Sequence, residues 1–311
     1  MTLTELSIHS ERLVKLENDF SHFDDTLQRL SLKKISMTTD QFMSFRNVVN
    51  LSLIETGLEE IPDLSLFSRL EYLSVREGRL LDARRLAAAP ALRALVLEAP
   101  DAALAAVPRL KRATFINAYA TDRIFGNCSE LESLSVERGS LNALRAGWLA
   151  GCARLRRLDL HDNLLEALPD SLLTDAVALT YLDLSHNMLR ALPSDLLKRS
   201  KTLTHLNVSH NLLTAVPNDL FVHTRQLLRL DLNHNRLTAV PSTLPNGPFE
   251  LKRLDLSHNQ LTDLPESFWF PVTAIASDLN LDLSHNKLSQ LLNVSSTEMK
   301  LFKGINLSHQ L

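Results

Sequence analysis

The sequence predicts an α/β fold, a solenoid of about fourteen coils with a parallel β-sheet along one side. Three observations predict it. Asparagines recur every 24 residues in the second half of the chain, a short frame of leucines precedes each one, and a leucine or valine followed by proline comes after most of them. Such a period is typical of solenoids, in which each repeat buries its apolar face only against its neighbours.

The leucine frame predicts one strand in each coil. Leu158 and Leu160 alternate with Arg157, Asp159 and His161. Alternation of apolar and polar residues is the signature of a strand with one buried face. We therefore expect the leucines to point inward and the other three side chains to point outward.

A column of asparagines predicts the turn that ends each strand. The asparagine side chain carries both donors and an acceptor, so it can satisfy backbone groups inside a turn. Because neighbouring strands lie about 4.8 Å apart, side chains at one phase should form a ladder. The predicted asparagine ladder consists of Asn163, Asn187, Asn211, Asn235, Asn259 and Asn286, with Gln310 in the same phase.

A further apolar position predicts how the opposite side of the core is filled. It lies three residues after each proline, and it is occupied by Leu172, Leu196, Leu220, Leu244 and Phe268.

This frame resembles the leucine-rich repeat, and seven successive copies cover residues 155–311. The 24-residue length, and the continuation from Pro217 to Phe221, are similar to the "typical" subfamily. That subfamily is mostly extracellular and includes Toll-like receptors and insect adhesion proteins. The resemblance implies a curved horseshoe with the sheet on its concave face, and it implies binding rather than catalysis.

The first half keeps the leucine frame but loses the asparagine. One predicted coil is only 18 residues long, shorter than usual for this repeat, so it is either irregular or misassigned. We expect a single leucine-rich-repeat domain over residues 1–311, degenerate in 1–150 and regular in 151–311, because 8 glycines leave little material for a flexible linker. The predicted turn positions are Glu11, Ile35, Thr56, Gly78, Pro100, Ala118 and Gly139.

Composition narrows the class of partner. The net charge of −3 and the isoelectric point near 6.4 predict no nucleic-acid partner, and no apolar run is long enough for a membrane span. Residues 1–15 fit a repeat strand rather than a signal peptide. Both ends lack caps, which predicts either a fragment or a homo- or hetero-oligomer joined through uncapped ends.

The two cysteines leave two alternatives. Cys128 and Cys152 occupy the same phase one coil apart, where later coils hold small residues. Small residues at this position favour buried free thiols. Adjacent coils would nevertheless bring the two Cα atoms within reach of a disulfide.

Five Asn-x-Ser/Thr sequons occur in the chain. Asn207 and Asn306 are expected on the strand face, where a glycan would obstruct binding. The glycosylation candidates are therefore Asn127, Asn293 and Asn50.

Two columns of titratable residues accompany the regular repeats. Aspartates between the inward leucines (Asp159, Asp183, Asp231, Asp255 and Asp282) should repel one another, which raises their pKa or attracts cations, although Arg157, Arg229 and Arg253 can offset this. They form either an acidic stripe for a basic partner or an ordinary solvated surface. Histidines at a second phase form either neutral turn residues or an acid-sensitive group: His186, His210, His234, His258, His285 and His309. No carboxylate or cysteine completes a tetrahedral site, so we expect no metal.

The most individual strand face lies within residues 29–137. Its outward positions mix apolar, aromatic and charged groups, as interfaces do, although degenerate repeats also vary more. The predicted ligand-binding residues on the concave face are Lys33, Ile54, Tyr72, Arg76, Val96, Glu98, Arg112 and Ile116.

No catalytic motif and no cofactor motif stands out. The sequence therefore predicts a non-enzymatic recognition module for a protein or microbial surface ligand. The resemblance implies an ectodomain or secreted fragment, extracellular or at the cell surface, in immune recognition or cell adhesion. The alternative is a cytosolic scaffold or adaptor for signalling proteins.

Overall fold

The structure is a computed structural model of the whole chain, which divides into two compact units, Met1–Ser140 (unit 1) and Leu141–Leu311 (unit 2). The structure describes residues 3–16, 26–38, 41–42, 44–58, 60, 62–77, 83–98, 107, 109–118, 128–241, 244, 251–264, 268, 279–289 and 303–310.

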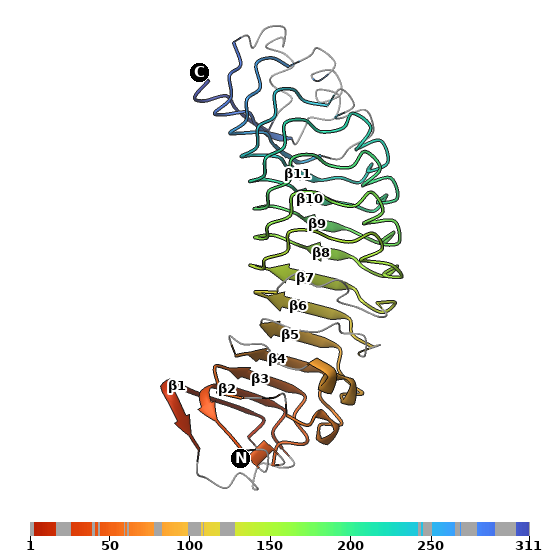
Figure 1. Cartoon of the computed structure of the whole chain (residues 1–311). Helices are drawn as coiled ribbons and strands as arrows, with labels where there is room; N and C mark the ends of the chain where they lie inside the picture. The colour runs from red at the N-terminus through yellow and green to blue at the C-terminus, as the bar shows by residue number, and fades with distance from the viewer. Residues whose placement is uncertain are drawn as a thin grey trace. The chain divides into compact units, whose positions relative to one another are not determined.

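Unit 1 is built on parallel strands that follow one another in chain order (Figure 1). Each strand pairs with the next, and short 3-10 helices η2 (Leu64–Leu66) and η3 (Ala83–Ala88) lie in two of the connections. The strands are β1 (Glu5–Lys15), β2 (Arg29–Ser36), β3 (Asn50–Ile54), β4 (Tyr72–Arg76), β5 (Ala94–Glu98), β6 (Arg112–Ile116) and β7 (Ser133–Glu137).

Unit 2 repeats the same plan with shorter strands in parallel register. They are β8 (Arg157–Asp159), β9 (Tyr181–Asp183), β10 (His205–Asn207), β11 (Arg229–Asp231), β12 (Arg253–Asp255), β13 (Asn280–Asp282) and β14 (Gly304–Asn306). Across the described residues the two units hold fourteen strands, one to a coil. This confirms the predicted solenoid with a parallel sheet.

The strand register settles two details of the degenerate half. Leu97 pairs with Phe115, so the 18-residue coil is a real short coil. The turn expected at Glu11 is wrong, because β1 stays extended to Lys15. Its register shifts after His9, and Val14 rather than Glu11 lies opposite Ile35.

The core follows the leucine frame. Leu158 and Leu160 are fully buried, and the position three residues after each proline is buried too, as Leu172 and Phe268 show. Burial of one such side chain contributes about 1.5–3 kcal/mol. The inward leucines are therefore the main source of cohesion between coils.

The residue before most of the turn positions has left-handed backbone, a feature that the leucine frame does not predict. Its φ is +54° at Asp162 and +53° at His186. Asparagine, aspartate and histidine tolerate this region better than most residues. The same conformation occurs at Lys34, Glu55, Asn117, Arg138, His210, His234, His258, His285 and His309.

The asparagine side chains close the turns in unit 2. Asn187 Oδ1 accepts from Leu165 N at 3.0 Å, and its Nδ2 lies 2.9 Å from Leu160 O in the preceding coil. The same amide also donates to Leu184 O and Ser185 O within its own coil. Gln310 performs this role at the last described turn, where its Oε1 accepts from Leu288 N at 3.1 Å.

Unit 1 uses a carboxylate for the same task in one coil. Glu77 accepts hydrogen bonds from the backbone N–H groups of Thr56, at 3.0 Å, and Gly57, at 2.9 Å. The acceptor again comes from the next coil along the chain. A glutamate therefore satisfies the buried turn where the asparagine is missing, and the leucine frame alone did not predict this.

Cys128 and Cys152 are both disulfide-bonded, and the chain has no other cysteine. The favoured expectation of free thiols is wrong. The position admits small residues, but two cysteines at the same phase of consecutive repeats are also within reach of a disulfide, and both side chains are buried. Among the described residues, no helix has the length and apolar character needed to cross a lipid bilayer.

Candidate ligand-binding face

The outward side chains of β1–β7 form three rows, which we call the unit 1 face. Register places Tyr72 in the first row, opposite Asn50. Val96 lies in the middle row, opposite Ser74 and Thr114. The rows follow directly from parallel pairing, which keeps residues of equal phase side by side.

All eight predicted ligand-binding residues lie on this face. Tyr72 and Arg112 belong to the first row and Val96 to the middle row. In the third row Ile54 pairs with Lys33 and with Arg76, and Glu98 pairs with Ile116. Lys33, Arg76 and Arg112 are exposed, and the other five are half-buried.

A shallow hollow of about 160 Å³ lies beside Tyr72 on the unit 1 face. Three serines, Ser7, Ser31 and Ser52, contribute to its lining together with Tyr72 and Asn50. Small side chains in the middle row thus leave a depression next to the aromatic ring. Its remaining lining residues are Glu5, Leu6, Arg29, Leu30 and Leu51.

The charged side chains around the hollow form only a weak, exposed ion pair. Arg29 and Glu5 form an ion pair at 3.6 Å, and their side chains are 64% and 59% exposed. Exposed pairs of this kind contribute little stability, about 0–1 kcal/mol. They can therefore exchange partners with a ligand at small cost.

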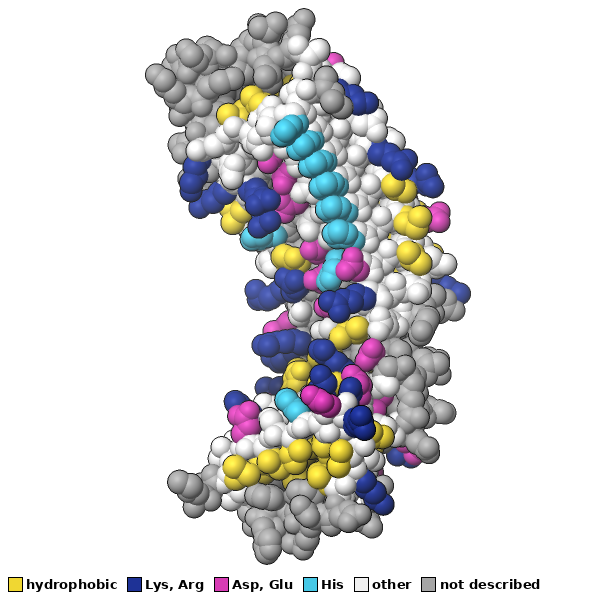
Figure 2. All heavy atoms as spheres, turned by 90° about the vertical axis from the view of Figure 1, so that its left-hand side faces the viewer, with side chains coloured by type: hydrophobic (Ala, Val, Ile, Leu, Met, Phe, Trp, Pro, Cys, Tyr) yellow, Lys and Arg dark blue, Asp and Glu magenta, His cyan; other side chains and the backbone are white. Residues whose placement is uncertain are grey.

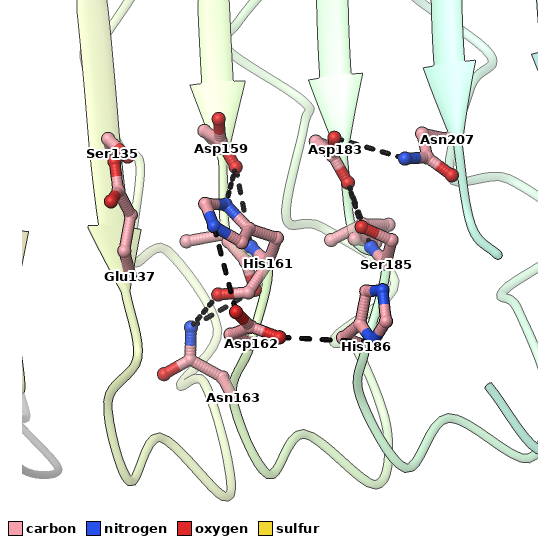
Figure 3. Close-up of polar contacts among 12 residues, drawn as sticks. Ser135, Glu137, Asp159, His161, Asp162, Asn163, Asp183, Ser185, His186 and Asn207 are labelled. Carbon is pink, nitrogen blue, oxygen red and sulfur yellow. Dashed lines mark hydrogen bonds and ion pairs between the residues drawn. The ribbon is translucent and has the colours of Figure 1, made fainter. Parts of the chain in front are cut away.

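The aspartates of unit 2 do not form a solvated acidic stripe. The side chain of Asp159 is only 8% exposed, because Arg157 Nη2 lies 2.8 Å away. His161 Nδ1 lies 2.7 Å from the other carboxylate oxygen (Figure 3). Asp183 accepts from the Ser185 hydroxyl at 2.6 Å and from Asn207 Nδ2 at 3.1 Å.

The pKa of Asp255 also differs from the expectation that stacked carboxylates have raised pKa values. Burial acts to raise it, but hydrogen bonds from Ser257, Asn233 and Arg253 outweigh burial and lower the pKa. Asp255 therefore stays ionised and is neutralised within the protein.

A row of larger side chains covers these aspartates, and it is missing from the predicted ligand-binding residues. Arg157 lies over the ring of Tyr181, with its guanidinium carbon 3.7 Å from the ring centroid. Burial, and then the charge of Asp183, raise the pKa of Tyr181, whose hydroxyl donates to Asp183 at 2.9 Å. The signal was present in the sequence as the position two residues before each aspartate.

A second hollow of about 160 Å³ opens beside this row. Its lining residues are Tyr181, His205, Leu206, Asn207, Arg229 and Asp231.

The histidine column is a stack of imidazole rings (Figure 2). From His186 to His285 adjacent ring centroids lie 4.1 Å apart, and the last pair, His285 and His309, lies at 4.5 Å. Adjacent planes are 10–13° apart, so the nitrogen lone pairs point in parallel and do not converge on one point. No cluster of three or more metal-ligating side chains occurs within the described part of the chain.

Of the three glycosylation candidates, only Asn50 lies among the described residues. Asn50 lies in β3 and lines the hollow beside Tyr72, so a glycan there would cover the unit 1 face. Asn127 and Asn293 lie outside the described residues. Asn207 uses its amide to bond Asp183 and its oxygen to accept from Ser209 N at 3.1 Å.

Comparison with known proteins agrees with this architecture. A family profile described as "Leucine rich repeat" matches residues 129–189, 177–237 and 225–272. The chain is a leucine-rich repeat protein. No curated protein matches the chain.

Solved structures share the leucine-rich-repeat fold at low sequence identity. The plant peptide hormone receptor RGFR1, in complex with RGF2, is 20% identical over 99% of this chain, with a TM-score of 0.70. An internalin, inlF, from Listeria monocytogenes is 17% identical over 99% of the chain (TM-score 0.72), and Drosophila Toll in its glycosylated complex with Spatzle is 19% identical over 99% (TM-score 0.75).

The leucine-rich-repeat chain covers different shares of these proteins. It spans 52% of RGFR1 and 44% of Toll, but 88% of the internalin. The likeness concerns the fold, since all three identities are low.

Proposed function

We propose that this leucine-rich repeat protein is a non-enzymatic recognition module that binds an extended segment of a protein ligand across the unit 1 face. The observation that carries the proposal is the grouping of apolar, aromatic and charged side chains on one accessible face. Ile54, Tyr72, Val96 and Ile116 supply apolar contact area. Lys33, Arg76, Glu98 and Arg112 supply the charged groups typical of an interface rim.

The hollow beside Tyr72 supports a ligand with a projecting side chain. Its serine floor and its exposed, loosely paired Arg29 and Glu5 offer hydrogen-bonding groups around a small depression. Aromatic residues at the edge of such depressions are frequent binding hot spots. A segment lying across the strands would place one side chain in the hollow and others over Ile54 and Val96.

The similar structures support the class of ligand. RGFR1 is described with the peptide hormone RGF2, and Toll with Spatzle. By analogy we infer a peptide or protein ligand for this chain, either a host protein or a component of a microbial surface.

The disulfide supports an extracellular or cell-surface location. Disulfides persist in oxidising compartments and are rare in the cytosol, so the bond between Cys128 and Cys152 favours an ectodomain or secreted protein over a cytosolic adaptor. Within that setting the proposed roles are immune recognition or cell adhesion. Association of copies through the ends of the solenoid remains part of the proposal.

Site-specific photocrosslinking tests the proposed face. A benzophenone amino acid is placed at Tyr72 or Ile116, and in a matched control at Val222, an apolar residue of unit 2 that is 43% exposed. The full chain is incubated with secreted proteins from the source tissue and then irradiated. We expect one shared adduct at Tyr72 and Ile116 and no such adduct at Val222.

A substitution completes the test. Ile54→Asp, on the same face, should abolish the adduct at Ile116 without changing the thermal melting temperature, because Ile54 is half-buried at the outward surface. Adducts of equal yield at Val222, or adducts that persist in Ile54→Asp, would overturn the proposal.

A further inference from the structure

The histidine column is fixed by the backbone as well as by ring stacking. All six residues are exposed, and all have left-handed φ between +52° and +55°. Identical backbone at every coil aims each ring in the same direction, which explains the regular ring spacing. Figure 2 shows the result as an unbroken line of imidazoles on the surface of unit 2.

Few carboxylates face this column. Asp162 Oδ1 lies 3.9 Å from His186 Nδ1, and Asp162 Oδ2 lies 3.9 Å from His161 Nε2 (Figure 3). Asp282 acts on His285 near the other end. Among the described residues, no ion pair joins a carboxylate to the three middle rings, His210, His234 and His258.

The remaining charged groups next to the column do not change this balance. The strand-side carboxylates are engaged within the protein: Asp183 with Ser185, Asp231 with Arg229 and Asp255 with Ser257. Exposed Arg236 and Lys287 follow His234 and His285 by two residues in the sequence and add positive charge. The middle of the column therefore has no internal counter-ion for a protonated ring.

Burial and the neighbouring histidines disfavour protonation of His210 and His285. For His210, burial and then the neighbouring rings His186, His234 and His258 lower the pKa. For His285, burial and then His258 and His309 lower it, and Asp282 partly opposes them. An external row of anions would relieve this repulsion, so by linkage proton uptake and anion binding strengthen each other.

We propose that the histidine column is an acid-dependent binding strip for a linear sulfated polysaccharide. The faces of the inner rings are covered by their neighbours, and only the ring edges meet solvent. Edge N–H groups donate well to sulfate oxygens in charge-assisted hydrogen bonds. A single-stranded nucleic acid would instead need free ring faces for base stacking, which this stack does not offer.

Binding of a defined heparin oligosaccharide to the full chain tests the proposal. Affinity is measured at about pH 7.5 and about pH 5.5, at equal ionic strength, across the range in which histidine titrates. We expect binding to be roughly ten-fold tighter at the lower pH and to weaken as salt is added.

Two matched variants show whether the histidine column causes the tighter binding at lower pH. In the first, His210, His234 and His258 are replaced together by asparagine, which tolerates left-handed backbone. In the second, His9, His205 and His223, which lie outside the column, are replaced by asparagine. The first variant should lose the pH-dependent gain, and the second should keep it, with both melting like the parent chain at neutral pH.

Several outcomes would overturn the proposal. These are absence of heparin binding, affinity that does not change with pH, and equal loss of the gain in both variants. A poly-uridylate oligonucleotide that binds as tightly, with the same pH dependence, would instead assign the strip to nucleic acid.

Discussion

The side-chain amide of Asn211 donates to the carbonyl oxygen of Leu184, in the preceding coil, at 2.9 Å. Asn211 Oδ1 also accepts from the backbone N–H of Leu189 at 3.0 Å. The amide also donates to Val208 O and Ser209 O in its own coil, so one buried side chain closes its own turn and joins two coils. Because each such bond lies out of contact with water, its loss leaves polar backbone groups unsatisfied.

Replacement of Asn211 by alanine should lower the free energy of unfolding by about 2–4 kcal/mol, since several buried backbone groups lose their partner at once. Urea denaturation measures the change. Asn142→Ala, at an exposed position of the same unit, is the control and should differ little from the parent chain. Equal stability of Asn211→Ala and the parent would contradict the structural role of the asparagine ladder.

Two leucines of unit 2, one in the core and one at the surface, test the contribution of buried side chains to stability. Leu158 is fully buried and Leu164 is 47% exposed. Leu158→Ala should cost about 2–5 kcal/mol, because it removes buried methyl groups and leaves a cavity. Leu164→Ala should change stability by no more than about 0.5 kcal/mol. Comparable losses in the two variants would mean that the register of β8 is wrong.

The disulfide predicts a redox-dependent stability. Removing the bond by Cys128→Ser and Cys152→Ser together should lower the unfolding free energy by about 3 kcal/mol, as expected for a closed loop of this length. The parent chain in reductant should melt at a similarly reduced temperature. Thiol titration of the denatured, unreduced protein should find no free thiol, and two free thiols would refute the bond.

Stability should fall in mild acid. The pKa values of His210 and His285 are lowered in the folded chain, so below the ordinary value near 6.5 the unfolded chain binds more protons. Folding is therefore disfavoured as pH falls from about 6.5 toward the folded pKa values. Asp255, whose pKa is lowered, contributes stability that is lost only at more acidic pH.

Melting temperatures at neutral pH and in mild acid measure this effect. His210→Asn should reduce the dependence on pH, while His223→Asn, outside the histidine column, should leave it unchanged. A parent chain that melts at one temperature throughout this range would contradict the prediction, because it would mean that folding leaves the pKa values of His210 and His285 unchanged.

Local patterns predicted the regular half well. The frame around Leu158 and Leu160 placed each short strand and its buried face, because alternation is a local property of an extended chain. The first half was harder. The role of Glu77 depends on which backbone groups the neighbouring coil leaves open, and no local pattern records that.

The candidate site was only partly accessible from sequence. Outward positions such as Ile54 and Tyr72 follow from alternation, but the hollow beside Tyr72 needs serines from three strands to align. Likewise, an aspartate column suggested an acidic surface, whereas Arg157 and Tyr181 cover Asp159 and Asp183 in space. Whether a charge is solvated depends on which side chains fold over it, and for Asp183 these include Asn207 from the next coil.

By itself, the sequence determined the repeat, the phase of the inward leucines and the position of each asparagine, because these depend on spacing along one chain. Tertiary structure decided the disulfide between Cys128 and Cys152 and the face-to-face stacking of the histidines. Both require adjacent coils to be superposed in register with the same backbone conformation at each level. That superposition is a property of the folded stack.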